Sequence, residues 1–197
     1  MVATVTSDLQ PSTRDRILDA AFDAVQAFGL SRITVEDVAH RARLSRQTVY
    51  RYFPSKDHVV LFLVAREEEK FMDGVRAAFA SHDEPEEAFA TAVEFVLRYT
   101  HEHPLLDRLL ATDEQTLLPY LTTRGLPLII HARETLVELM SPRMPGVEQD
   151  ELRGLLDLVC RSMISYMLTP SERPPDSVAR MMSRAAVAPL LRSPTPS

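Results

Sequence analysis

Residues 31–60 read SRITVEDVAHRARLSRQTVYRYFPSKDHVV, and this stretch decides how the N-terminal part of the chain folds. Thr34 is a good helix N-cap residue, and Asp37 three positions later completes a short variant of the capping box. Ser45 is a second N-cap residue. Pro54 ends the helix that Ser45 begins, because proline disfavours helical geometry at the residue before it. The stretch therefore predicts two short capped helices separated by a tight turn.

The second of these helices, expected over 46–53, has the composition of a helix that reads DNA. Val49 and Phe53 are four residues apart, so both can pack inward. The side chains left to point outward or sideways are Arg46, Gln47, Thr48, Tyr50, Arg51 and Tyr52. Two short helices, the second basic and aromatic, describe a helix-turn-helix, whose recognition helix presents polar side chains to base edges in the major groove.

The run Thr48-Val49-Tyr50-Arg51-Tyr52-Phe53-Pro54-Ser55-Lys56, with the capped helix before it, closely resembles the DNA-binding signature of the tetracycline-repressor (TetR) family. The likeness covers about residues 13–60 and extends to the rest of the chain only through length and helical content. It implies a bacterial transcriptional repressor that binds an inverted-repeat operator in double-stranded DNA as a homodimer. It also implies release from DNA by a small effector, whose identity stays open.

The resemblance implies roles that suit the chemistry of the residues concerned. Tyr50, Tyr52 and Lys56 are expected to contact phosphates, and Thr34 is expected to help position the protein on the DNA backbone. Arginine suits guanine and glutamine suits adenine, so Arg46, Gln47 and Thr48 are the expected base readers. The expected DNA-binding residues are Thr34, Arg46, Gln47, Thr48, Tyr50, Arg51, Tyr52 and Lys56.

Two positions depart from the family's usual pattern. Arg43 occupies a turn position often held by glycine, so the turn either avoids the left-handed region or accepts a strain of about 1–2 kcal/mol. Gln47 stands where relatives often have glycine and adds a side chain to the DNA face. The operator sequence is therefore hard to borrow from relatives.

The charge distribution agrees with this reading. The whole chain has a net charge of −6, yet residues 31–56 contain six basic residues and only two acidic ones. Such an asymmetry between segments is a modest indication of nucleic-acid contact.

The rest of the chain favours helix almost throughout. Ile17, Ala21, Val25 and Phe28 recur on one face of a helix over 13–28, which Gly29 ends. Ser55 is expected to cap a long helix that runs to about residue 80. Later helices are expected over 84–101, 105–111, 117–140 with a possible break at 125–127, 148–168 and 176–191. The fold class is all-α with about nine helices, in which a three-helix helix-turn-helix domain precedes a helical regulatory and dimerisation bundle. The expected domains are a flexible arm over 1–12, a DNA-binding domain over 13–56, a ligand-binding and dimerisation domain over 57–192 and a disordered tail over 193–197.

Two sets of residues in the second domain are candidates for regulation. An effector cavity could be lined by Phe95, Tyr99, Leu109, Leu110, Tyr120, Ile129 and Met163, a largely apolar set that suits a hydrophobic or acyl-like ligand. TetR relatives usually dimerise through their last two helices, which here carry Leu152, Leu155, Val159, Val178, Met181, Met182 and Ala185. Ordinary core packing is the competing explanation for both sets.

Other protein classes find less support in the sequence. No apolar run is long enough to span a bilayer and no secretory signal is visible, so a cytoplasmic protein is expected. None of the six histidines follows a glutamate by three residues, as di-iron bundles require, and Cys160 has no adjacent base. His101 and His103 could chelate a metal only where their helix has ended. We expect no catalytic residue, metal or cofactor; the alternatives are a helical-bundle metal-binding enzyme and a protein-interaction module without DNA binding.

Overall fold

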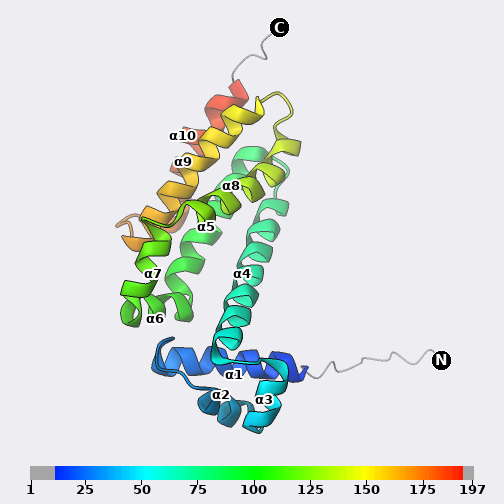
Figure 1. Cartoon of the computed structure of the whole chain (residues 1–197). Helices are drawn as coiled ribbons and strands as arrows, with labels where there is room; N and C mark the ends of the chain where they lie inside the picture. Colours follow the sequence, from blue (N-terminus) through cyan, green and yellow to red (C-terminus); the bar gives the residue numbers. More distant parts are fainter. Residues whose placement is uncertain (1–11, 193–197) are drawn as a thin grey trace, which may run out of the picture. The chain divides into compact units, whose positions relative to one another are not determined.

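The computed structural model describes residues 12–192, apart from the side chains of Asp107, Thr116, Leu117, Tyr120 and Arg192. Its regular structure is helical throughout those residues, as predicted, with ten α-helices and one 3₁₀ turn (Figure 1). These are α1 (Thr13–Phe28), α2 (Val35–Ala42), α3 (Arg46–Tyr52), α4 (Lys56–Ala80), α5 (Pro85–Glu102), α6 (Pro104–Thr112), α7 (Glu114–Leu121), α8 (Leu126–Met140), η1 (Ser141–Arg143), α9 (Gln149–Leu168) and α10 (Pro175–Arg192). The arm and tail expected over 1–12 and 193–197 lie, apart from Ser12, outside the described residues. No helix in the described part of the chain is both long and apolar enough to cross a membrane.

The chain forms two compact units that divide inside α4, between residues 67 and 68. The domain boundary predicted from the sequence lies earlier, directly after Lys56. The first half of α4 groups with the N-terminal unit because its side chains bind α1: Arg66 Nη1 donates to Asp19 Oδ1 at 2.7 Å.

The N-terminal unit is built on the predicted apolar faces. Ile17, Ala21 and Val25 of α1 are completely buried. Phe28 was expected on the same face, but it lies at the end of the helix and is 42% exposed. The guanidinium of Arg41 covers its ring, with 4.9 Å between the guanidinium carbon and the ring centroid.

The predicted caps hold the short helices of this unit in place. The backbone N–H of Asp37 donates to Thr34 Oγ1 at 3.2 Å, and the backbone N–H of Thr34 donates to Asp37 Oδ2 at 2.9 Å, which completes the capping box of α2. Ser45 caps α3 by accepting from the backbone N–H of Thr48 at 3.1 Å. Helix α3 ends at Tyr52, one residue earlier than predicted.

In the C-terminal unit, α5 packs against both α9 and α10, and α9 also packs against α8. The buried core draws on α4, α5, α8, α9 and α10, and its largest fully buried members include Phe79, Phe89 and Leu156. The helix expected over 117–140 is broken, since α7 ends at Leu121 and α8 begins at Leu126. The break covers 122–125 and meets the predicted 125–127 only at Gly125. Pro127 instead lies in the first turn of α8, because proline starts a helix more readily than it continues one.

Candidate nucleic-acid interface and regulatory unit

The recognition helix α3 is anchored from one side only. Val49 and Phe53 are 0% exposed, as predicted. Phe53 also packs against Phe62 of α4, with 5.6 Å between the ring centroids. Because these residues fix the inner face, Tyr50 and Tyr52 remain 50% and 41% exposed on the outside.

A surface hollow of about 600 Å³ brings together four of the eight expected DNA-binding residues. Thr34, Arg46, Tyr50 and Lys56 all line it, although they come from three different helices or their caps. Arg46 and Tyr50 are four residues apart on α3 and therefore share a face. Sequence spacing alone does not show that Thr34 and Lys56 face the same opening.

The hollow has the features of an anion-binding surface. It is lined by the first residues of two helices, Thr34 and Val35 at α2 and Ser55 and Lys56 at α4. Helix N-termini present free backbone N–H groups and a partial positive charge, so they favour phosphate. Lys56 adds a full charge, and its ammonium is held in place by donating to the carbonyl of Ser31 at 2.9 Å.

The other four expected residues lie outside this lining. Gln47, Arg51 and Tyr52 are exposed, and the Arg51 guanidinium lies 5.5 Å from the centre of the Tyr52 ring. Thr48 is only half-exposed, and its hydroxyl is 2.9 Å from that of Ser45. Thr48 is therefore engaged in the cap of its own helix.

Glu36 lies on this surface but was not among the expected DNA-binding residues. It is the acidic member of the hollow's lining, and its Oε2 forms an ion pair with Nη2 of Arg46. The pair joins the start of α2 to the start of α3. The available signal was weak: Glu36 is one of only two acidic residues in the basic stretch 31–56.

The turn between α2 and α3 adopts the strained alternative left open by the sequence. Arg43 has φ 53° and ψ 47°, in the left-handed region. Its N–H donates to the carbonyl of His40 at 3.1 Å, and the N–H of Leu44 donates to that of Ala39 at 2.9 Å. These two bonds form a Schellman motif, which normally has glycine at the position of Arg43.

In the C-terminal unit, part of the expected effector lining forms a row of aromatic rings. Phe95 and Tyr99 are 5.5 Å apart between ring centroids, and Phe71 lies beside both at 6.1 and 5.1 Å. His103 continues the row, 4.6 Å from Tyr99. Phe71 and His103 were not among the expected residues.

The remaining candidates for the effector lining differ in burial. Leu109 and Ile129 are buried, Leu110 is half-buried, and Met163 packs against the core of the unit. The side chain of Tyr120 lies outside the described residues. A shared cavity for this set stays a prediction.

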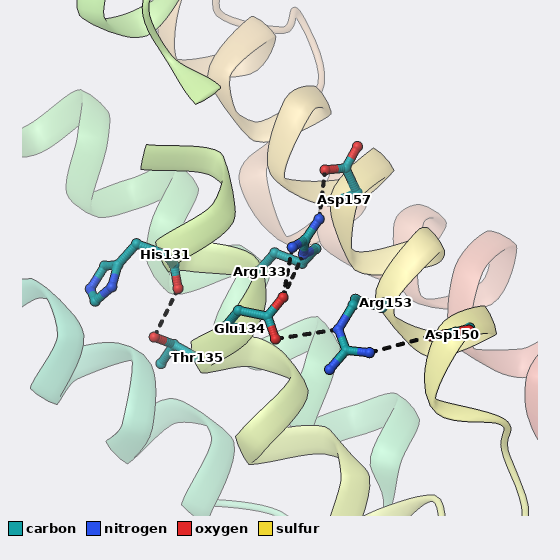
Figure 2. A network of polar contacts seen from close by, with 7 residues as sticks. All are labelled: His131, Arg133, Glu134, Thr135, Asp150, Arg153 and Asp157. Carbon is teal, nitrogen blue, oxygen red and sulfur yellow. Dashed lines mark hydrogen bonds and ion pairs between the residues drawn. The ribbon is translucent and has the colours of Figure 1, made fainter. Parts of the chain in front are cut away.

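Helices α8 and α9 are joined by a network of ion pairs (Figure 2). Glu134 of α8 accepts from its neighbour Arg133 at 2.9 Å and from Arg153 of α9 at 3.3 Å. The hydrogen bond from Arg133, followed by that from Arg153, lowers the pKa of Glu134. Asp157 of α9 lies between Arg133 at 3.5 Å and Arg161 at 2.7 Å. Two ion pairs therefore connect α8 to α9, one between Glu134 and Arg153 and one between Arg133 and Asp157.

The expected dimer residues divide between core and surface. Leu152, Val159 and Val178 are buried inside the unit at 1%, 5% and 1% exposure, so they serve its core and are not available to a partner. Leu155 and Met182 are half-buried and pack on that core. Met181 and Ala185 are exposed on α10, where they line a hollow of about 460 Å³ together with Arg173, Ser177, Arg180 and Arg184.

Cys160, His101 and His103 are the residues with side chains suited to enzyme or metal chemistry that the sequence raised. Burial raises the pKa of the Cys160 thiol to about 11, which keeps it protonated and unreactive at neutral pH. His101 is exposed, whereas His103 is half-buried in the aromatic row. Within the described residues, no three histidine, cysteine or acidic side chains are grouped so that they could hold a metal ion.

Both parts of the chain match known regulators in sequence. Residues 17–62 match the bacterial regulatory proteins of the tetR family, and residues 84–188 match the C-terminal domain of the bacterial tetracycline repressor. The transcriptional regulator AlkX of Mycobacterium tuberculosis is 29% identical over 168 residues, which are 84% of this chain and 80% of AlkX. The repressor KstR of Rhodococcus jostii is 39% identical over 66 residues, which are 34% of this chain and 31% of KstR.

Solved structures agree with the sequence matches. The TetR-family repressor AlkX from Dietzia sp. strain DQ12-45-1b, implicated in the biodegradation of n-alkanes, is 29% identical and superposes with a TM-score of 0.65. That match covers 92% of this chain and 96% of the Dietzia protein. The fatty acid degradation regulator FadR of Bacillus halodurans has the same fold, with a TM-score of 0.63 at 16% identity over 90% of this chain and 95% of FadR.

Proposed function

Because the chain belongs to the TetR family of bacterial regulatory proteins and is a DNA-binding transcriptional regulator, we propose that it is a homodimeric repressor released from its operator by a hydrophobic effector. The observation that carries the DNA-binding part is the hollow shared by Thr34, Arg46, Tyr50 and Lys56. Its two helix N-termini and its lysine suit a phosphate, while the exposed face of α3 suits base edges.

The contacts follow from where each side chain lies. Tyr50 and Lys56 bind phosphates from within the hollow, and Tyr52 binds a phosphate from the other side of α3. Arg46 and Gln47, at the exposed start of α3, read bases. Two recognition helices in a dimer reach successive major grooves when they are one DNA turn apart, roughly 34–36 Å.

The effector part rests on the aromatic row and on the relatives. The rings of Phe71, Phe95 and Tyr99 offer an apolar surface to a chain-like ligand. The Dietzia repressor is implicated in n-alkane biodegradation, which favours an alkane-derived or fatty acyl compound as effector here. Such a ligand would release DNA by binding more tightly to a state in which the recognition helices no longer match the groove spacing.

Selection of bound duplexes from a random DNA pool, at a stated moderate salt, tests the DNA-binding proposal. The expected result is an inverted repeat with half-sites about one turn apart. The variants are compared on the selected duplex and on duplexes altered at single bases. Lys56→Ala should weaken binding to all of them alike, whereas Gln47→Ala should relax the preference at particular bases. Wild-type protein that recovers no sequence above background, in a preparation shown to be folded, would contradict the proposal.

The selected duplex then serves to test the effector. Fatty acids and alkanes of graded chain length should release it, while strongly polar compounds of similar size should not. Release by the polar compounds alone would rule out a hydrophobic effector and leave the DNA-binding proposal standing.

A further inference from the structure

Glu36 is an acidic residue on a surface that is otherwise arranged to receive phosphate. Its carboxylate shares the hollow with Lys56 and the start of α4, and it forms an ion pair with Arg46. Glu36 is the second residue of α2 and Arg46 is the first residue of α3, so the pair bridges the two helices. A carboxylate here repels DNA, so its presence needs a physical explanation.

Stability supplies only a small part of it, because a carboxylate in the first turn of α2 interacts favourably with the helix dipole. The side chains of Arg46 and Glu36 are 57% and 66% exposed, and exposed ion pairs contribute little to the free energy of folding. Glu36 is also not needed as a cap, since the side chains of Thr34 and Asp37 already form the capping box of α2.

The geometry of the guanidinium suggests a different role. Arginine has five N–H donors in a rigid fork, so a carboxylate on one edge leaves the other donors available for guanine O6 and N7. An unrestrained arginine carries about 2 kcal/mol of rotamer entropy and can swing to the nearest phosphate instead. An arginine already held by Glu36 presents one orientation to the bases.

We propose that Glu36 is a specificity-determining positioning residue, which holds Arg46 for base reading and disfavours its use as a phosphate contact. The inference rests on the proposed function of α3 as the recognition helix. It assigns Glu36 a double effect: weaker binding to unrelated DNA and stronger preference at the base that Arg46 reads.

The experiment compares wild type, Glu36→Gln, Arg46→Ala and the double variant on the selected operator, on operators altered at single bases and on an unrelated duplex. Glu36→Gln should bind the unrelated duplex several-fold more tightly, with a steeper salt dependence, because Arg46 is freed to neutralise a phosphate. Its preference at the Arg46-dependent base should fall about tenfold, part of the roughly 1–3 kcal/mol that a bidentate contact discriminates.

The double variant separates positioning from a general charge effect. Once Arg46 is removed, Glu36→Gln should cause no further loss of base preference. Glu36→Asp keeps the charge but shortens the reach, so it should lie between wild type and Glu36→Gln both in binding to unrelated DNA and in base preference. Asp23→Asn, an equal charge change at an exposed position of α1, is the matched control and should leave the preference unchanged.

The outcomes separate a failure of the proposed role of Glu36 from a failure of the proposed DNA-binding function. A wild-type protein without sequence preference would overturn both. A selective wild type whose preference is unaffected by Glu36→Gln, or by Arg46→Ala, would overturn the role of Glu36 and leave the DNA-binding function intact. Equal effects of Glu36→Gln and Asp23→Asn would reduce Glu36 to one surface charge among others and would also overturn the inference.

Discussion

Single residues carry opposing demands in the helix-turn-helix, and Arg43 shows this most clearly. The turn needs a left-handed residue to redirect the chain from α2 to α3, and the Schellman hydrogen bonds place Arg43 there with φ 53°. A side chain with a Cβ is strained in that region, whereas glycine is not. The turn geometry is thus kept at a cost in stability.

Replacing Arg43 by glycine should therefore stabilise the protein. The expected gain is about 0.5–1 kcal/mol in the free energy of unfolding, after the greater unfolded-state entropy of glycine offsets part of the relieved strain. Urea unfolding measures it. His40→Gly, at an ordinary helical position of the last turn of α2, is the matched control and should destabilise by a similar amount. Destabilisation by both variants would show that Arg43 is not strained.

The capping box of α2 should make stability depend on acid pH. The hydroxyl of Thr34, and then its backbone N–H, lower the pKa of Asp37 below its ordinary value of 3.8. A carboxylate whose pKa is lowered by folding adds stability above its unfolded pKa, and loses it as the pH falls through the folded pKa.

We therefore expect wild type to be more stable than Asp37→Asn above pH 4, and the difference to disappear as the pH falls below 3.8. Urea unfolding of both proteins between pH 3 and pH 6 checks this. Thr34→Ser keeps the hydroxyl and should retain the pH dependence. A wild-type advantage that is the same at every pH would exclude the Asp37 carboxylate as its source.

At the scale of elements, packing distance separates two glycines that look alike in sequence. Gly74 of α4 faces Phe95 of α5 so closely that an added Cβ would lie 2.1 Å from the tip of the ring. Gly154 of α9 has no atom within 4 Å of such a Cβ, apart from its own helix backbone and chain neighbours. The first glycine permits a helix contact, and the second only weakens its helix.

The two alanine variants should accordingly change the free energy of unfolding in opposite directions. Gly74→Ala forces the Phe95 ring out of the aromatic row and should destabilise by about 1–3 kcal/mol, as overpacking does. Gly154→Ala should stabilise by about 0.5–1 kcal/mol, because alanine is the better helix former. Thermal unfolding of both variants tests the pair, and Gly74→Ala combined with Phe95→Leu should recover part of the loss. Equal effects at the two sites would contradict the close α4–α5 contact.

At the scale of the whole molecule, only part of the residue set predicted for the dimer interface is available to a partner. Three of its seven expected residues are buried in the core of their own unit. Of the seven, Met181 and Ala185 remain exposed on α10, where Arg180 and Arg184 line the same hollow. Methionine next to arginine is a composition enriched at protein interfaces.

Met181→Glu should weaken dimerisation at least tenfold, about 1.4 kcal/mol, by placing a desolvated charge in the interface. Sedimentation equilibrium over a range of protein concentrations measures the change. Leu126→Glu introduces the same charge at an equally apolar, exposed position of α8 and should leave the dimer intact. If Met181→Glu dimerises as wild type does, the interface lies elsewhere.

Local interactions were predictable from sequence. The predicted features that depend only on residues within four positions of one another are of three kinds. They are the caps at Thr34, Ser45 and Ser55, the inward positions of Val49 and Phe53, and the possible break before Pro127. Hydrogen bonds and side-chain contacts at this range leave a regular spacing in the sequence, so they can be read without a structure.

Contacts between helices were decided only by the tertiary structure. Three examples involve residues with no fixed spacing in the sequence. They are the ion pair of Glu36 with Arg46, the hollow shared by Thr34 and Lys56, and the burial of Leu152 and Val178 against other helices. The physical reason is that an amphipathic helix specifies which of its faces must be covered, but not whether its own unit or a partner covers it. The sequence alone thus determined the helices, their caps and the family, while the fold decided which polar groups meet and which apolar residues remain for a second subunit.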